Sequence, residues 1–404
     1  MTALRTIVSR LGHVPAGIWT LGFVSMLMDV SSEMIHALLP IYMVTVLGTS
    51  TLAVGIIEGI AEATAAITKV FSGALSDWLG RRKDLAALGY GLAACTKPIF
   101  PLAPSIDWLV AARFIDRVGK GIRGAPRDAL IADLAPPEVR GASFGLRQSL
   151  DTVGAFVGPL LAILLMLATA NSFTTVFWIA VVPAFLSFFL IVFLVHEPER
   201  PAALRIVKSP LSRTELARLG AQYWWVVAIA AVFTLARFSE AFLLLRAQSV
   251  GLPVALVPGV LVLMNVAYAL AAYPAGVLSD QMNRGTILVA GLLVLIASDL
   301  ILASTTTTLG VSMGVALWGL HMGLTQGLMA TLVADSAPSE LRGTAYGVFN
   351  LVSGVALLAA SIIAGGLWDA IGPRGTFLAG AAFAGLSLVG LRALDVGRQR
   401  RGAQ

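Results

Sequence analysis

Acidic side chains and one histidine stand within the first two apolar stretches of the chain, where charged groups are costly. Asp29 and Glu33 are four residues apart and share a helix face, and His36 follows three residues later. Glu58 and Glu62 repeat the four-residue spacing in the next stretch. Carboxylates crowded together at low dielectric hold a proton more tightly, as a proton-carrying site requires near neutral pH. We predict that these groups converge and that at least one of them, first Glu33 or Asp29, carries a proton or cation.

A stripe of charge follows in the fourth apolar stretch. Its members are spaced by three and four residues, and a further pair stands at i, i+4 in the fifth stretch. An unpaired arginine in this stripe would attract an anionic or carboxylate-bearing substrate through two parallel hydrogen bonds. A fully paired arginine would only hold helices together. In that alternative, several of the acidic groups above simply pair with Arg113 or Arg117 as static struts. The charged residues of this predicted substrate cavity are Arg113, Asp116, Arg117, Lys120, Arg147 and Asp151.

The second half of the chain offers fewer charges at comparable depth. Arg237 and Glu240 occupy the middle of the seventh stretch and can pair with each other or with Glu33. His321 can relay a proton, although a lone membrane histidine is as often a hydrogen-bond donor between helices. The neutral groups that complete the predicted cavity are Asn265, Tyr268, Gln326 and Asn350.

No metal or cofactor is expected. Methionines cluster with His36 in the first stretch and with His321 in the tenth, and thioether and imidazole ligands suit copper. Core packing explains these methionines better, because the single cysteine, Cys95, lies apart from both groups. One cysteine also excludes an internal disulfide. A lysine-bearing glycine-rich loop for nucleotide phosphates is missing from the sequence, so we do not expect ATP hydrolysis.

The elements that position these residues are membrane-spanning helices. The chain is 57% hydrophobic and only 12% charged, against about 25% charged residues in a soluble domain. Its apolar runs reach about 20 residues, enough to cross a bilayer. The sequence therefore predicts an all-α, polytopic membrane protein. The twelve expected spans lie near residues 16–46, 51–79, 84–103, 107–134, 140–169, 173–195, 222–249, 254–280, 285–304, 308–334, 340–368 and 373–394.

Lysine and arginine gather in alternate joints between these spans. This asymmetry places both termini in the cytoplasm. The first apolar run is long and is not followed by a small-residue cleavage site, so it is interpreted as a retained span. The formal charge of +6 marks the inner face of a cytoplasmic (inner) membrane rather than a nucleic-acid partner, because the basic residues form no exposed stripe.

Two sequence segments recur at nearly the same offset. The segment from Ile131 (IADLAPPEVRGASFG) returns from Val333 (VADSAPSELRGTAYG), 202 residues later. The segment from Gly73 (GALSDWLGRR) returns from Gly276 (GVLSDQMNRG), 203 residues later. The chain is thus a duplicated six-span unit, an arrangement typical of alternating-access carriers. We predict two pseudo-symmetric six-helix bundles, residues 1–198 and 220–404, joined by a cytoplasmic linker at 199–219.

The segment from Gly73 to Lys83 resembles the signature joint between helices two and three of the major facilitator superfamily. It has a glycine, an aspartate four residues on, and then a glycine with basic residues. In that family the joint latches the cytoplasmic side, so the resemblance implies the same role here, with Arg127 or Arg140 as partners of Asp77. The alternative is a simple positive-inside anchor. The implied gate residues are Gly73, Asp77, Gly80, Arg81, Arg82, Arg127, Arg140, Asp280 and Arg284.

The fifth span is similar to the glycine and proline signature of bacterial drug:proton antiporters within that superfamily. It reads GAFVGPLLA from Gly154 to Ala162, with Ala162 in place of the last glycine. Small residues allow close packing and proline bends a helix, so Gly154, Gly158 and Pro159 are predicted to act as a pivot or seal. In the fourth span, the segment LVAAR from Leu109 to Arg113 is similar to the start of another antiporter signature. The sequence then departs from that signature, with Asp116 and Arg117 where Gln and Gly are usual.

The resemblance implies a major facilitator fold and a secondary active transporter, not an enzyme. The expected function is proton-coupled export of a small organic compound by a monomer whose partners are its substrate, protons and membrane lipid. One alternative is proton-coupled uptake of an organic anion or metal chelate, which the basic stripe favours. Another is a membrane-embedded lipid flippase or scramblase, which is disfavoured because spans six and twelve have no charged residue in their interiors.

Overall fold

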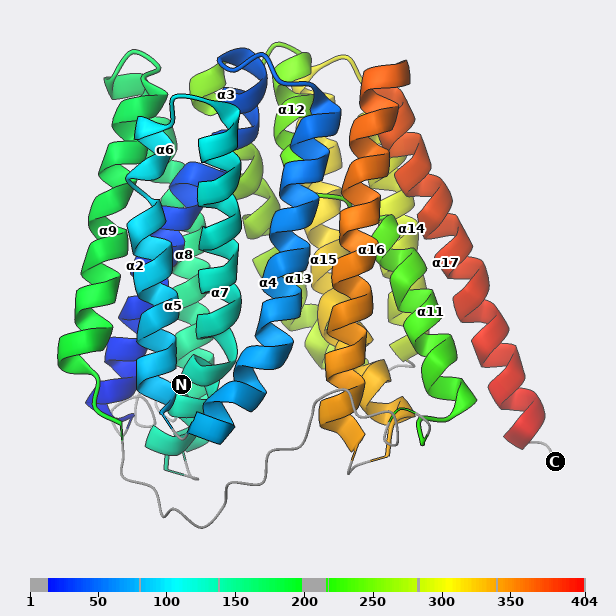
Figure 1. Ribbon diagram of the computed structural model, residues 1–404. Coiled ribbons are helices and arrows are strands. Elements are labelled where there is room, and N and C mark those ends of the chain that lie inside the picture. Colours follow the sequence, from blue (N-terminus) through cyan, green and yellow to red (C-terminus); the bar gives the residue numbers. More distant parts are fainter. Residues whose placement is uncertain are drawn as a thin grey trace, which may run out of the picture. The chain divides into compact units, whose positions relative to one another are not determined.

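The computed structural model describes residues 14–79, 81–136, 139–197, 216, 218–281, 284–338 and 341–402, and its regular secondary structure there is helical. The helices of the first half are α2 (Ala16–His36), α3 (Leu39–Thr45), α4 (Thr51–Leu79), α5 (Arg82–Thr96), α6 (Ile99–Leu102), α7 (Ile106–Leu134), α8 (Arg140–Ala168) and α9 (Phe173–Leu194). Those of the second half are α11 (Ala221–Leu235), α12 (Ala241–Ser249), α13 (Gly259–Gln281), α14 (Arg284–Ser304), α15 (Thr308–Ser336), α16 (Arg342–Ile371) and α17 (Pro373–Gly402), with a 3₁₀ turn at Val254–Leu256. Each predicted span corresponds to one helix or to a helix broken near its middle or end (Figure 1).

Many of these helices are suited to a bilayer. Within the described residues, nine helices are long and apolar enough to cross a membrane. The chain is therefore a multi-pass membrane protein. The helix α7 is not one of the nine, because it carries the charged stripe that the sequence predicted.

The chain forms two compact units. The first comprises residues 1–38 and 64–209, and the second comprises residues 39–63 and 210–404. The first part of α4 therefore belongs to the second unit. The predicted linker at 199–219 lies almost wholly outside the described residues, and the division at 198 and 220 stays a prediction.

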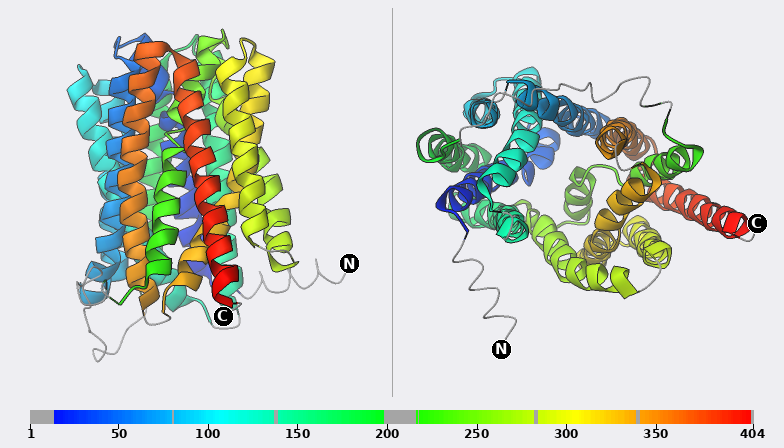
Figure 2. Two further views of the ribbon diagram at one scale, coloured as in Figure 1. Left: turned by 90° about the vertical axis from the view of Figure 1, so that its right-hand side faces the viewer. Right: turned by 90° about the horizontal axis from the view of Figure 1, so that it is seen from below.

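The two units repeat one pattern of helix packing. In the first, α2 packs on α8 and α9, and α5 packs on α7 and α9. In the second, α11 packs on α16 and α17, and α14 packs on α15 and α17. Figure 2 shows α17 beside α11 and α14. Spans 1, 3, 4, 5 and 6 thus meet as spans 7, 9, 10, 11 and 12 do, which is the structural counterpart of the sequence repeat.

Glycines set the closest helix contacts of the first unit. A Cβ atom added to Gly154 of α8 would lie 2.6 Å from the carbonyl oxygen of Met26 in α2, and one added to Gly158 would lie 2.9 Å from that of Val30. Between α5 and α7, a Cβ atom at Gly89 would lie 2.7 Å from the carbonyl oxygen of Gly119. Backbones approach this closely only where side chains are missing. These contacts hold α8 close against α2 and α7 close against α5.

Candidate functional site

Two groups of charged residues lie among the helices of the first unit. The first group, here named the arginine–aspartate cluster, takes its residues from α2, α7 and α8. It contains three arginines and three aspartates, namely Asp29, Arg123, Arg127, Asp128, Arg147 and Asp151.

Within this cluster, α8 and the last part of α7 are held by close ion pairs. Arg147 Nη1 lies 2.9 Å from Asp151 Oδ2 and 3.5 Å from Asp128 Oδ1. Arg127 Nη2 lies 3.0 Å from Asp128 Oδ1, and Arg127 Nη1 donates to Ser25 Oγ at 2.7 Å. The pair predicted at i, i+4 in the fifth span is thus present and is joined to the fourth span.

Arg123 and Asp29 face each other at the other side of the cluster. Arg123 Nη2 lies 3.9 Å from Asp29 Oδ1, which is too far for a hydrogen bond. The guanidinium carbon of Arg123 lies 4.9 Å from the ring centroid of Tyr90, a cation–π contact. Arg123 Nη1 is buried and has no hydrogen-bond partner. The Arg123 side chain is 6% exposed and that of Asp29 is 28% exposed, so the carboxylate is the more accessible of the two.

The second group lies nearer the start of α7 and is buried. Lys97 Nζ donates to Asp116 Oδ1 at 2.8 Å and to Ser32 Oγ at 3.0 Å. Arg117 Nε lies 3.6 Å from the other oxygen of Asp116. We name Lys97, Asp116 and Arg117 the buried triad.

His36 joins the fourth span as well. Arg113 Nη2 lies 2.8 Å from His36 Nδ1. Because a guanidinium can only donate, Nδ1 accepts and the imidazole is neutral in this arrangement. Arg113 therefore contacts the histidine of α2.

Sequence reasoning missed two cations of the first unit. Arg123 continues the stripe three residues after Lys120 and would have been found by extending that spacing. Lys97 is a lone lysine inside the third apolar run, which was itself a signal. Lys120, which was predicted, is exposed.

The predicted proton-carrying residues are divided between the units. Asp29, Glu33 and His36 lie in the first unit, whereas Glu58 and Glu62 lie in the second. Their convergence stays a prediction.

Span seven of the second unit is broken at residues 236–240, between α11 and α12. Arg237 lies in this break, with its guanidinium carbon 5.6 Å from the ring centroid of Phe233. The other predicted cavity residues here are half-buried, namely Glu240, Asn265, Tyr268, Gln326 and Asn350.

Two titratable residues of the second unit are fully buried beside aromatic rings. His321 lies against Trp318, with ring centroids 5.3 Å apart, and neither ring nitrogen has a hydrogen-bond partner. Asp299 has no partner for either carboxylate oxygen. A Cβ atom on Gly380 would lie 2.6 Å from Asp299 Oδ2 and 3.1 Å from Cε1 of Phe238. Asp299 was missed by sequence reasoning, although an aspartate within an apolar run was a sufficient signal.

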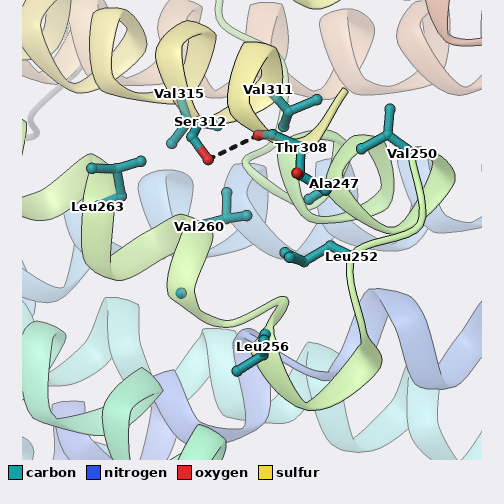
Figure 3. Close-up of a pocket in the computed structure, with 11 residues that line it drawn as sticks. Ala247, Val250, Leu252, Leu256, Val260, Leu263, Thr308, Val311, Ser312 and Val315 are labelled. Carbon is teal, nitrogen blue, oxygen red and sulfur yellow. Dashed lines mark hydrogen bonds between the residues drawn. The ribbon is translucent and has the colours of Figure 1, made fainter. Parts of the chain in front are cut away.

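The second unit also contains a cavity of about 180 Å³ between α12, α13 and α15. Figure 3 shows that valine and leucine side chains line it, with Thr308 and Ser312 on one side. The Ser312 hydroxyl donates to the carbonyl oxygen of Thr308 at 2.9 Å. None of the predicted site residues lines this cavity, and its lining contains no charged group.

The predicted gate is described in part. Arg82 Nη1 lies 2.8 Å from Asp133 Oδ2, and the Glu197 carboxylate accepts from the backbone N–H groups of Arg82 and Lys83 at 2.8 and 2.9 Å. Arg81 lies 3.7 Å from Asp84 at the surface. Gly80 and the side chains of Asp77, Asp280 and Arg284 lie outside the described residues, and Arg140 is exposed. The latch function of this joint stays a prediction.

At the opposite end of α4, a carboxylate caps the helix within the second unit. Asp369 of α16 accepts from the backbone N–H groups of Thr51 and Leu52 at 3.0 and 2.9 Å, and from the Thr51 hydroxyl. A negative charge is favourable at this helix terminus.

A multi-pass helical protein whose two units repeat one packing pattern, with ionised side chains inside one of them, has the architecture of a membrane transporter. The model of the Major Facilitator Superfamily matches residues 21–361 and residues 241–402, and the chain belongs to this family. It is therefore a membrane transporter with a small-molecule substrate and not an enzyme.

Relatives and solved structures agree with this assignment. The chain is 35% identical over 382 residues to an uncharacterized MFS-type transporter of Methanocaldococcus jannaschii, covering 92% of both chains. It is 30% identical over 328 residues to an uncharacterized protein of Mycobacterium tuberculosis, covering 80% of both. Its fold resembles a POT family transporter in complex with 5-aminolevulinic acid (TM-score 0.77, 13% identity, 95% and 96% covered). It also resembles the human organic anion transporter MFSD10 (TM-score 0.67, 17% identity, 93% and 100% covered). The drug:proton antiporter subgroup stays a prediction.

Proposed function

We propose that the protein is a proton-coupled secondary transporter of a small organic solute, working by alternating access in the cytoplasmic membrane with both termini in the cytoplasm. Asp29 is the group that takes up the transported proton. The observation that carries this proposal is the position of Asp29 in the arginine–aspartate cluster. Its carboxylate is partly exposed. It interacts electrostatically with Asp151 of α8 and with Arg123, Lys120 and Arg127 of α7.

Charges of both signs around one accessible carboxylate allow that carboxylate to change its protonation state. The negative Asp151 favours protonation of Asp29, and the neighbouring cations favour its release. A fixed strut would need neither solvent access nor an opposing carboxylate. Glu33 follows Asp29 by one turn and packs against Gly158, where a Cβ atom would lie 2.7 Å from Glu33 Cβ. It is the second candidate carrier.

Export and uptake are both compatible with a proton site of this kind. The glycines of the fifth span, which suggested an exporter, pack α8 against the backbone of α2 and do not indicate a direction. The arginines of the cluster favour the second candidate function, the uptake of an organic anion together with protons.

The proposal is tested in liposomes that contain the purified protein and a trapped pH-sensitive dye. The solutes offered are benzenesulfonate and succinate as anions, benzenesulfonamide as a neutral compound, and phenyltrimethylammonium as a cation. With an acidic outside solution, we expect one class of solute to move protons and to be concentrated or expelled against its gradient. A proton ionophore should abolish this.

Asp29→Asn should lose accumulation driven by the pH gradient but keep solute exchange at equal pH, because an amide cannot carry the proton. Asp107→Asn, at the exposed start of α7, is the matched control and should transport normally. Full gradient-driven transport by the Asp29→Asn and Glu33→Gln variants would show that the proton assignment is wrong.

A further inference from the structure

Resting on the proposed function, we infer that the transported solute is an organic anion that binds Arg123, and that protonation of Asp29 releases Arg123 for this anion. Proton and anion are then bound together by the first unit. Proton binding and anion binding are coupled because the Arg123 guanidinium has two alternative partners. One is the Asp29 carboxylate, and the other is a carboxylate, sulfonate or phosphonate group of the substrate.

The first step is the charge of the arginine–aspartate cluster. Its three arginines and three aspartates balance while Asp29 is ionised. Taking up one proton on Asp29 leaves one uncompensated positive charge, and exposed Lys120 on α7 adds to the positive potential. A monoanion restores the balance. The solute therefore binds as an anion while the proton stays on the Asp29 carboxyl. Together they leave the net charge of the cluster unchanged.

The second step is the geometry of Arg123. At 3.9 Å its Nη2 atom is close enough to Asp29 to attract it but makes no hydrogen bond, and its Nη1 atom has no partner at all. By contrast, Arg147 and Arg127 make close pairs with Asp151 and Asp128 at 2.9 and 3.0 Å. Nε of Arg147 also lacks a partner, but Arg123 is the arginine of this cluster whose terminal Nη1 and Nη2 atoms make no hydrogen bond to a carboxylate. The Tyr90 ring holds its guanidinium in place at 4.9 Å, so its two terminal nitrogens are oriented before a ligand arrives.

The third step is that the fold does not need these charges. The repeat offset of 202 residues places Thr325 of α15 at the position of Arg123, Phe349 of α16 at that of Arg147, and Ser353 at that of Asp151. The second unit packs α14 on α15 and α11 on α16, as the first packs α5 on α7 and α2 on α8. Because uncharged residues serve the same packing there, a purely structural role does not account for the cluster.

Three groups from neighbouring helices bear on the titration of Asp29 besides Arg123. Asp151 belongs to α8, and Lys120 and Arg127 belong to α7. Glu33 lies one turn further along α2 itself. Asp151 favours the neutral form of Asp29, and the cations favour its ionised form. Anion binding at Arg123 removes a favourable neighbour from the ionised form, so anion and proton each promote the binding of the other.

The test is thermal unfolding of the purified protein in detergent with each of the four solutes, the anions benzenesulfonate and succinate, the neutral benzenesulfonamide and the cation phenyltrimethylammonium, at pH 6 and pH 8. A ligand that binds the folded state raises its melting temperature. In the wild type we expect stronger binding at pH 6, with the dissociation constant rising about tenfold per pH unit above the titration of Asp29. Asp29→Asn should bind the anions tightly at both pH values. Arg123→Gln should bind neither anion, and Arg374→Gln, an exposed arginine in the second unit, should behave as the wild type.

If Arg123→Gln does not fold, Arg123→Lys keeps the positive charge but not the paired donors. It should bind about 10-fold more weakly or worse, as expected for losing a charged hydrogen bond. Unchanged anion binding in both Arg123 variants would overturn the inference. It would also be overturned by a wild type that binds only the cation or the neutral compound, or none of the four.

The liposome experiment separates this inference from the proposed function. Gradient-driven transport that depends on Asp29 but moves phenyltrimethylammonium or benzenesulfonamide would overturn only the anion inference. Binding of anions at Arg123 without any proton movement would overturn the proposed function.

Discussion

The two units treat buried charge in opposite ways at equivalent positions. In the first, Lys97, which directly follows α5, is fully buried and is paired with Asp116 of α7 at 2.8 Å. The repeat offset of 202 residues places Asp299 of α14 at the position of Lys97, and Trp318 of α15 at that of Asp116. Asp299 is equally buried but has no hydrogen-bond partner. The same helix pair is thus built once around an ion pair and once around a lone carboxyl beside aromatic rings.

This difference shows that the two halves kept the same helix packing after duplication, while the buried side chains at equivalent positions came to differ in charge. A buried ion pair must keep both partners, because removal of one leaves an uncompensated charge. A lone buried carboxyl avoids that cost only by remaining neutral. The first unit therefore keeps its buried charges ionised as a paired set, whereas Asp299 can contribute only as a neutral acid in the described arrangement. Variants of Asp116 and Asp299 test this contrast, and a variant of Gly154 tests the helix packing that duplication preserved.

The largest effect is expected from Asp116→Asn. It leaves Lys97 and Arg117 buried without their shared carboxylate, which should lower the free energy of unfolding by about 3–5 kcal/mol. Unfolding in detergent, followed by tryptophan fluorescence, measures the loss. The double variant Lys97→Met with Asp116→Leu removes both charges and should recover most of it. A single variant as stable as the wild type would show that the buried triad is not an obligatory ion pair.

A smaller effect is expected where glycine presses α8 against α2. Gly154→Ala would place a methyl group 2.6 Å from the Met26 carbonyl oxygen, and such overpacking costs about 1–3 kcal/mol. Gly145→Ala is the matched control on the same helix, because no atom lies within 4 Å of its added Cβ. Alanine favours helix over glycine, so the control should be neutral or slightly stabilising. Equal behaviour of the two variants would contradict the close α2–α8 contact.

The smallest effect is expected from Asp299→Asn. If Asp299 is a neutral acid, an amide of nearly the same shape replaces it, and the free energy of unfolding should change by less than about 1 kcal/mol. The same measurement as for Asp116→Asn compares one substitution at two buried aspartates. A loss as large as that of Asp116→Asn would reveal a charged partner for Asp299 and remove the contrast between the units.

The sequence by itself determined the membrane class, the spans and the duplication. Apolar runs of about 20 residues cross a bilayer wherever they occur in a chain, so the predicted 51–79 and 308–334 agree closely with α4 (Thr51–Leu79) and α15 (Thr308–Ser336). The motif from Gly73 and its copy indicated the family that the family model confirmed. The spacing of Arg147 and Asp151 also sufficed, because residues four apart on a helix are always neighbours.

Only the tertiary structure decided which charges from different helices meet. Asp29 lies beside Arg123, and Lys97 of the third span lies beside Asp116 of the fourth. These pairs depend on the rotation of each helix about its axis and on its depth against its neighbour. The close contacts at Gly89, Gly154 and Gly158 depend on the same rotation and depth. A single sequence gives the face of each helix but not the face that it meets, because that choice is made by packing between segments far apart in the chain.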